Sequence, residues 1–490
     1  MTESVKCKSG YHVGIKSDDI FIFQGITYGK FDQRWGKSYL TTDCQKEFSK
    51  SIVSAPQTVI EKSILYDSSL PKEKEQCLSL NVASPNLDDK LPVLVWIHGG
   101  GFMTGSSHSA MYQIQNLAKN GMVVVSINYR LGPFGFLRLK DITEGEIDSS
   151  GNEGLRDQRV ALQWIQKNIE HFGGNKDNVT ICGLSSGSWS CALQIAAGHG
   201  NLFKNAICQS GGLDAIASLD KANKWGELFL QRFLELGLSI NDLMHCPWEK
   251  IIEAAKKLRH YQLSEGGKLV LPEIGYLPVI DNDFLNDDFA QVFDQSEINI
   301  IAGSTLDEYN LWSFFHPKIR QNDEKYILKR LKKIFINDFL DEILEVYEEF
   351  LDSKNLAKIF SAVMTDISFG IPTHNLLMKS KGKNFGYVFS TQSKLMSGKL
   401  GCFHASELPY MFGVHKTQPY DGWCSENGDS VSHNIQSSWK NFVDSSNPSF
   451  DDFTWQEYND GQLTLLGSRV KTITNPFLER YKLVEKYKNF

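Results

Sequence analysis

The stretch NVTICGLSSGSWSCALQIAA, residues 178–197, has the pattern of a strand, a tight turn and a helix. The apolar run VTIC comes first, a tight turn follows, and a segment with helical character comes last. The turn Gly183-Leu184-Ser185-Ser186-Gly187 fits the pattern Gly-x-Ser-x-Gly between a strand and a helix. There a sharp turn presents Ser185 at a helix N-terminus, where the helix dipole favours developing negative charge. A serine that only caps a helix is the alternative, but the strand-turn-helix context favours a nucleophile.

A second glycine-rich turn lies earlier in the chain, where HGGGF (98–102) directly follows the apolar run LPVLVWI (91–97). Glycines after a strand let backbone N–H groups turn toward a ligand, and acyl transfer needs such donors where a carbonyl oxygen becomes an oxyanion. We therefore predict an oxyanion hole made by the N–H groups of Gly100, Gly101 and Ser186. A phosphate-binding loop is disfavoured because no Gly-Lys-Ser/Thr follows, and a flexible turn is the other alternative.

Short apolar runs alternate with helical segments along the rest of the chain. This alternation predicts an α/β fold with a mostly parallel central sheet and helices on both faces. Residues 215–265 and 324–380 are helical and charged in character. No repeat or linker divides the sequence, so we expect one domain, 1–490, in which 215–300 and 310–395 include helical insertions that form a cap and the pocket. The expected strands are 12–16, 20–27, 78–85, 91–97, 122–129, 178–182, 203–212 and 298–304, and the clearest helix is 156–172.

Composition excludes several classes of protein. The 490 residues are 41% hydrophobic, enough for a large core, and carry 51 basic against 58 acidic residues, a net charge of −7. This mildly acidic balance gives no reason to expect nucleic acid or an anionic membrane as a partner. The apolar runs are far shorter than the about 18 residues of a membrane span, and the start lacks the apolar core of a signal peptide. We expect a soluble, cytoplasmic protein.

The nine cysteines form no Cys-x-x-Cys pair, so the sequence indicates neither a zinc site nor a thioredoxin-like motif. Reduced and mostly buried thiols are the simplest interpretation.

Through its two glycine-rich turns and the blocks around them, the chain resembles the type-B carboxylesterase/cholinesterase family of α/β-hydrolases. Within that family it is most similar to the bacterial para-nitrobenzyl-esterase-like carboxylesterases. The resemblance runs from about residue 10 to about residue 460. It implies the α/β-hydrolase fold and a serine esterase that uses no metal and no organic cofactor. The densest matching blocks are 75–85, 91–106, 123–137, 151–187, 276–285, 302–309, 402–413 and 438–458.

A serine nucleophile needs a histidine base and an acid that orients it, and in α/β-hydrolases the chain order is Ser, acid, His. Of the histidines after Ser185, only His404 lies in a block, FHASELPY, that matches the histidine loop of the family. The resemblance implies Glu308 in STLDEY as the acid. Asp307 beside it is the local rival, and Asp281 is a weaker one.

Three further positions bear on the site. Ser210 matches a buried serine that supports the acid in the family, with turn or helix capping as its ordinary role. Leu184 and Ser186 stand where the family usually has Glu and Ala. Loss of that glutamate removes a carboxylate that attracts cationic substrates, so we do not expect choline-ester specificity.

The N-terminal part departs from secreted relatives. Arg34 and Glu75 are expected to form the ion pair that relatives have there, with ordinary surface charges as the alternative. Cys77 stands where secreted relatives have a disulfide-bonded cysteine, but its partner position holds Ala55. We therefore expect no bridge at Cys77, and Cys44 is a less favoured partner.

The predicted activity is hydrolysis of short- or medium-chain carboxylic esters in a largely apolar pocket, through a Ser-His-Glu triad and an acyl-enzyme. An amidase, carbamate hydrolase or thioesterase would use the same residues. A non-catalytic cholinesterase-like binding protein is disfavoured because Ser185, Glu308 and His404 are all present.

Overall fold

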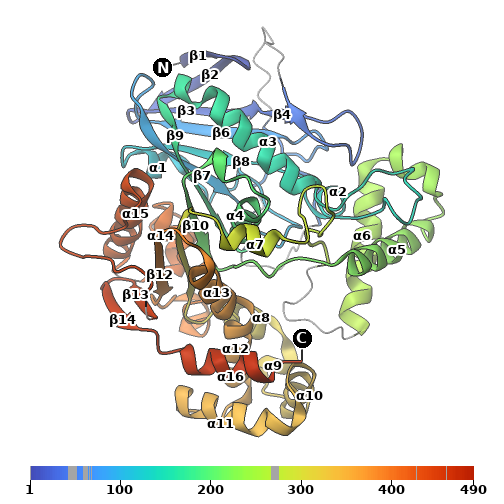
Figure 1. Ribbon diagram of the computed structural model, residues 1–490, viewed down its shortest axis with the longest axis vertical. Coiled ribbons are helices and arrows are strands. Elements are labelled where there is room, and N and C mark those ends of the chain that lie inside the picture. Colours follow the sequence, from blue (N-terminus) through green and yellow to red (C-terminus); the bar gives the residue numbers. More distant parts are fainter. Residues whose placement is uncertain are drawn as a thin grey trace.

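A twisted 12-stranded sheet forms the centre of the molecule, with helices on both sides (Figure 1). The computed structural model describes residues 2–41, 52–58, 65, 67, 69–265, 275–425, 427–459 and 461–489, with the backbone alone for 259–265. The strand order is β1-β2-β3-β6-β8-β7-β9-β10-β11-β12-β13-β14. The strands from β8 to β13 run parallel, whereas both margins of the sheet are antiparallel. The predicted α/β class, with a mostly parallel sheet, is confirmed.

The strands of this sheet are β1 Thr2–Cys7, β2 Gly10–Ser17, β3 Ile20–Thr27, β6 Ser79–Ser84, β7 Leu91–Ile97, β8 Val123–Ile127, β9 Gly174–Leu184, β10 Asn205–Gln209, β11 Asn299–Thr305, β12 Asn384–Phe389, β13 Gln462–Leu466 and β14 Lys471–Thr474. A separate antiparallel pair consists of β4 Gly29–Lys30 and β5 Tyr39–Leu40.

Alternating side chains of the buried strands pack into two cores on opposite faces of the sheet. In β7, Val93, Val95 and Ile97 join one core, and Leu94 and Trp96 join the other. Because both faces are covered, most central strands are apolar runs, which is why the sequence predicted all of those from β8 to β11. The first face is covered by α3 Glu153–Asn168, α4 Ser186–Ala196, α7 Phe289–Asp294 and α13 Ile371–Lys379, and the second by α1 Ile114–Ala118, α14 Leu408–Met411 and α15 Gly428–Ser445.

Further helices extend beyond the sheet and confirm the helical character predicted for 215–265 and 324–380. One group projects to the side as a pair, and the other lies below the sheet in Figure 1. The pair is α5 Leu219–Leu234 and α6 Trp248–Glu265. The second group comprises α8 Asn310–Phe315, α9 Pro317–Arg320, α10 Glu324–Ile334, α11 Leu340–Leu351, α12 Leu356–Thr365 and the C-terminal α16 Leu478–Tyr487; a short helix, α2 Gly132–Gly135, precedes α3.

The segment 310–395 is more than a helical insertion, because its last part forms β12, an inner strand of the central sheet. The prediction also missed β1, β13 and β14 at the margins.

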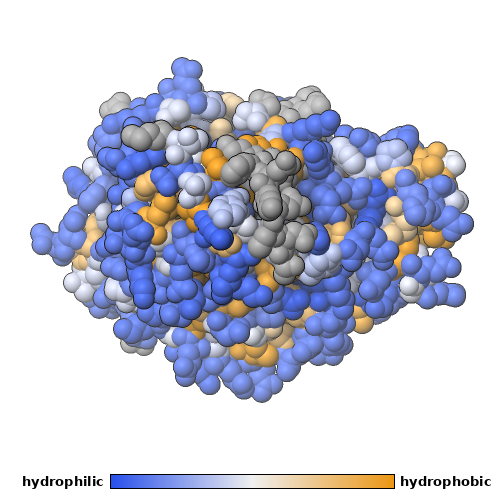
Figure 2. Space-filling model, turned by 90° about the horizontal axis from the view of Figure 1, so that it is seen from above, coloured by the Kyte–Doolittle hydropathy of each residue, from blue (hydrophilic) through white to orange (hydrophobic). Residues whose placement is uncertain are grey.

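The surface seen from above is largely hydrophilic, with separate apolar patches (Figure 2). Within the described ranges, no helix has both the length and the apolar character required to cross a bilayer.

The sheet topology brings the sequence motifs to one edge. Parallel neighbours place their carboxyl ends side by side, which is where α/β proteins build their sites. The HGGG turn at residues 98–101 follows β7, Ser185 follows β9, Ser210 follows β10, and Glu308 lies three residues beyond β11. These four strands are consecutive in the sheet, in the order β7-β9-β10-β11.

Candidate active site

Ser185 occupies a strained turn between β9 and α4. Its backbone angles are φ 57° and ψ −122°, in a region that L-residues other than glycine rarely adopt. Flanking glycines make this turn sterically feasible: a Cβ on Gly183 would lie 2.4 Å from the Gly187 carbonyl carbon, and one on Gly187 would lie 2.1 Å from the Ile97 oxygen. Such strain is typical of a nucleophile elbow and is not required of a serine that only caps a helix.

The HGGG turn packs directly against this elbow. A Cβ on Gly99 would lie 2.5 Å from the Leu184 carbonyl oxygen and 3.3 Å from the Ser185 Cβ. Gly100 and Gly101 both have positive φ, 124° and 62°. Within the described residues their N–H groups donate no hydrogen bond, so both are available to a ligand oxygen.

Glu308 and His404 form a buried, hydrogen-bonded pair. His404 Nδ1 lies 2.5 Å from Glu308 Oε2, and the carboxylate is inaccessible to solvent. The other carboxylate oxygen, Oε1, accepts the N–H of Thr305 at 2.7 Å and the hydroxyl of Ser210 at 2.5 Å. With Nδ1 donating to Glu308, Nε2 is the nitrogen that remains to act as a base.

The end of β10 connects the elbow to this pair. The N–H of Ser185 donates to the carbonyl of Gln209 at 2.9 Å, and the next residue, Ser210, binds Glu308, which in turn binds His404. No hydrogen bond joins Ser185 Oγ to His404 in the part of the chain that the structure describes. Such bonds often tighten only when substrate is present.

The rival carboxylates have other roles. Asp307 accepts the N–H of Cys402 at 2.8 Å and returns its own N–H to the Cys402 carbonyl at 2.9 Å, and thereby holds the loop that carries His404. Burial raises the pKa of Asp307. Asp281 accepts three backbone N–H groups of its own turn and lies 3.3 Å from Arg156. The geometry therefore favours Glu308 as the partner of His404.

Two aromatic side chains that the sequence analysis missed lie against the imidazole. The ring centroids of Trp312 in α8 and Phe369 lie 5.1 Å and 4.8 Å from that of His404. Phe369 belongs to a π-helical turn, Asp366–Gly370, between α12 and α13. Both residues fall in 310–395, where no motif pointed to them, although π-helical turns are frequent at functional sites.

A second buried carboxyl, Glu407, was also missed, although it stands three residues after His404 in the matching block. It accepts a hydrogen bond from Gln209 Nε2 at 3.3 Å. Burial, and then the charge of Glu308, raise the pKa of Glu407 to about 8. Its protonated form therefore predominates at pH 7, and it adds little negative charge next to Glu308.

The expected N-terminal ion pair is present. Arg34 binds Glu75 in a bidentate manner, with N···O distances of 2.6 and 2.8 Å, and also donates to the Cys246 carbonyl near α6. Cys77 is buried and unbridged, as expected. Cys44, the less favoured partner, lies outside the described residues.

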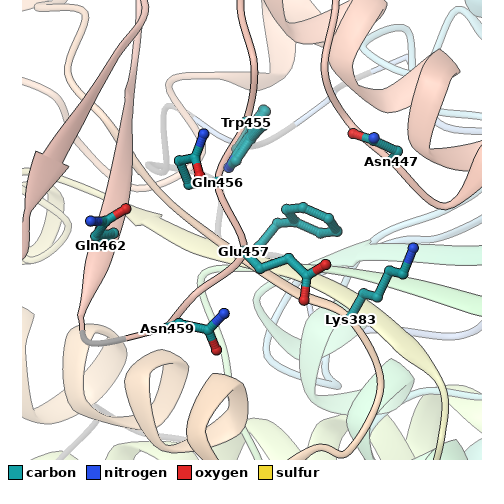
Figure 3. A pocket seen from close by; sticks show the side chains of 8 residues that line it. Lys383, Asn447, Trp455, Gln456, Glu457, Asn459 and Gln462 are labelled. Atoms are coloured by element: carbon teal, nitrogen blue, oxygen red, sulfur yellow. The ribbon is translucent and has the colours of Figure 1, made fainter.

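A polar cavity of about 390 Å³ lies elsewhere, at the amino ends of β12 and β13 (Figure 3). This is the edge of the sheet opposite to the one that carries Ser185. Its lining residues are Lys383, Phe385, Asn447, Trp455, Gln456, Glu457, Asn459 and Gln462.

The fold and the arrangement of the two glycine turns define an α/β-hydrolase. More specifically, the chain belongs to the carboxylesterase family, whose model matches residues 8–483, and it is a hydrolase of that family.

Known proteins of this family are similar to most of the chain in sequence and in structure. It is 31% identical to the para-nitrobenzyl esterase of Bacillus subtilis (strain 168) over 430 residues, which cover 84% of this chain and 83% of that protein. It is also 31% identical to a phenmedipham hydrolase of Pseudarthrobacter oxydans, with 89% of each chain covered. The crystal structure of the carboxylesterase EST55 from Geobacillus stearothermophilus superposes with a TM-score of 0.83 at 26% identity, over 98% of this chain and 99% of that one.

Proposed function

We propose that the protein is a serine carboxylesterase that cleaves small carboxylic esters into acid and alcohol. The observation that carries this proposal is the buried Glu308–His404 hydrogen bond of 2.5 Å, connected through β10 to the strained Ser185. Membership of the carboxylesterase family supports the reaction class.

The reaction begins when His404 Nε2 removes the proton of Ser185, whose oxygen attacks the ester carbonyl. The negative charge that develops on the carbonyl oxygen is bound by the N–H groups of Gly100, Gly101 and Ser186. Glu308 stabilises the imidazolium, which then gives its proton to the leaving alcohol. Water, activated by the same histidine, releases the acid from the acyl-enzyme. The chemistry needs no metal and no organic cofactor.

The substrate is proposed to be a small, uncharged ester. Leu184 is buried beside the nucleophile where a glutamate would attract a cation, which disfavours choline esters. Trp312 and Phe369 contribute apolar surface next to His404. The second candidate is hydrolysis of an amide, carbamate or thioester by the same residues. One relative is named as a phenmedipham hydrolase, so phenmedipham is one of the compounds to be tested.

A substrate panel separates these candidates. We expect p-nitrophenyl esters of increasing acyl length to be cleaved with far higher kcat/KM than the p-nitroanilides of the same acids, since an amine is a poorer leaving group. Matched thioesters and phenmedipham complete the panel. A higher kcat/KM for an anilide, a thioester or phenmedipham than for every ester would replace the carboxylesterase proposal with that activity.

A cytoplasmic location is supported by eight described cysteines that form no bridge, as in a reducing compartment. A single catalytic domain is supported by the one sheet that carries all the candidate site residues. The partner is a small molecule rather than nucleic acid, in line with the net charge of −7.

A further inference from the structure

The π-helical turn Asp366–Gly370 is anchored by a buried ion pair at its first residue. Arg480 of α16 lies with Nε 3.0 Å from Asp366 Oδ2 and donates from Nη2 to Oδ1 at 3.2 Å. Tyr347 of α11 donates its hydroxyl to the same carboxylate at 2.6 Å. Arg480 and Asp366 are only 5% and 3% exposed, so removing either side chain would leave the other as a buried, uncompensated charge.

The same helix touches the other end of the turn. A Cβ on Gly370 would lie 2.3 Å from the hydroxyl of Tyr481, the neighbour of Arg480 in α16. The guanidinium of Arg480 also lies 3.5 Å above the ring of Phe350, which restricts its position. In Figure 1, α16 lies between α12 and α11, next to the junction that contains the turn. The C-terminal helix therefore holds the turn at both ends.

Between these two anchor points, the turn presents Phe369 to the candidate active site. The Phe369 ring is 4.8 Å from His404 and stacks on Trp312 at 5.8 Å with an interplanar angle of 13°. A π-helical turn contains an extra residue and is rarely stable by itself, so it depends on tertiary contacts for its shape. If the turn relaxed to ordinary helix, the register of Phe369 relative to His404 would change.

We infer that Arg480 is a positioning residue for ester hydrolysis: through Asp366 it fixes the turn that sets Phe369 beside the imidazole of His404. The inference rests on the proposed function, since it concerns the same site. Because Phe369 contributes apolar surface beside His404, the C-terminal helix, far from Ser185 in sequence, thereby influences which esters the site accepts.

The test is Arg480→Met, which keeps an unbranched apolar stem but removes the charge. We expect kcat for p-nitrophenyl butyrate to fall by roughly ten- to a hundredfold, because small displacements near the reacting atoms are costly. The ratio of kcat/KM for p-nitrophenyl octanoate to kcat/KM for p-nitrophenyl butyrate should rise, because displacement of the Phe369 ring leaves more room for the longer acyl chain. Arg480→Lys keeps the charge, so its kcat and its ratio of kcat/KM should lie between those of wild type and Arg480→Met.

A matched control lies in the same helix. Tyr487 stacks on Phe339, with centroids 4.0 Å apart, and belongs to the end of α16 that is remote from Arg480. We expect Tyr487→Ala to lower the thermal midpoint and to leave the acyl-chain profile unchanged. A purely structural role of α16 would instead make Arg480→Met behave like Tyr487→Ala.

A second variant covers the case in which Arg480→Met does not fold. Gly370→Ala keeps the ion pair but forces a methyl group against Tyr481, and it should produce the same change in acyl-chain profile. The inference is overturned if the folded variants keep the wild-type profile while wild-type protein hydrolyses the esters. If wild-type protein hydrolyses no ester, the proposed function itself fails.

Discussion

Ser185→Ala is expected to lower kcat/KM for p-nitrophenyl acetate by roughly 10⁴- to 10⁶-fold, the range typical of a lost serine nucleophile. The oxygen that would form the acyl-enzyme is removed, whereas the Cβ and the glycines that shape the turn remain. Because the strain at φ 57° resides in the backbone, we expect the fold and the thermal midpoint to change little. Initial rates and thermal unfolding of purified wild type and variant measure both quantities.

Ser188→Ala provides the matched control. Ser188 is also buried in α4, three residues further on, and donates to the Gly211 carbonyl at 2.9 Å. Its removal should cost some stability and leave kcat/KM close to the wild-type value. Turnover retained by Ser185→Ala, or abolished equally by both variants, would remove Ser185 from the role of nucleophile.

The second large effect is expected from Glu308→Gln, which should lower kcat by roughly 10³- to 10⁴-fold. The substitution keeps the size of the side chain but removes the charge that stabilises the imidazolium. The new amide can also donate toward Nδ1 and so favour the wrong tautomer of His404. Asp307→Asn should have a much smaller effect, because the amide oxygen still accepts the N–H of Cys402.

The comparison decides between two adjacent carboxylates that the sequence could not separate by spacing. Both variants should be assayed with thermal unfolding as a reference, since each changes a buried group. If kcat is lower for Asp307→Asn than for Glu308→Gln at equal thermal stability, Asp307 is the acid and the assignment of Glu308 is wrong.

Sequence reasoning recovered the centre of the sheet better than its margins. The parallel strands are buried on both faces, so β7 appears in the sequence as the uninterrupted run LPVLVWI. By contrast, β1 (TESVKC) and β14 (KTIT) lie at the sheet margins and are partly exposed and polar, so they lack this signal. The inner strand β12, NFGYVF, is buried along its whole length but was missed, because it follows a long helical stretch and Gly386 interrupts its apolar run.

For the site, the sequence was informative where function depends on local backbone geometry. The elbow and the HGGG turn are contiguous motifs, and the histidine block carried His404. The positions of Trp312 and Phe369 depend on contacts between helices distant in sequence, including the anchoring of the π-helical turn by Arg480. Glu407 is an ordinary-looking glutamate whose raised pKa arises only on burial beside Glu308.

Covalent labelling with a fluorophosphonate, followed by peptide mapping by mass spectrometry, tests whether Ser185 is the nucleophile. We expect a single adduct on Ser185 in the wild-type protein, none in Ser185→Ala, and much slower labelling of His404→Ala. If the folded wild-type protein takes up no label, or carries the label on another residue, Ser185 is not the nucleophile of a serine esterase.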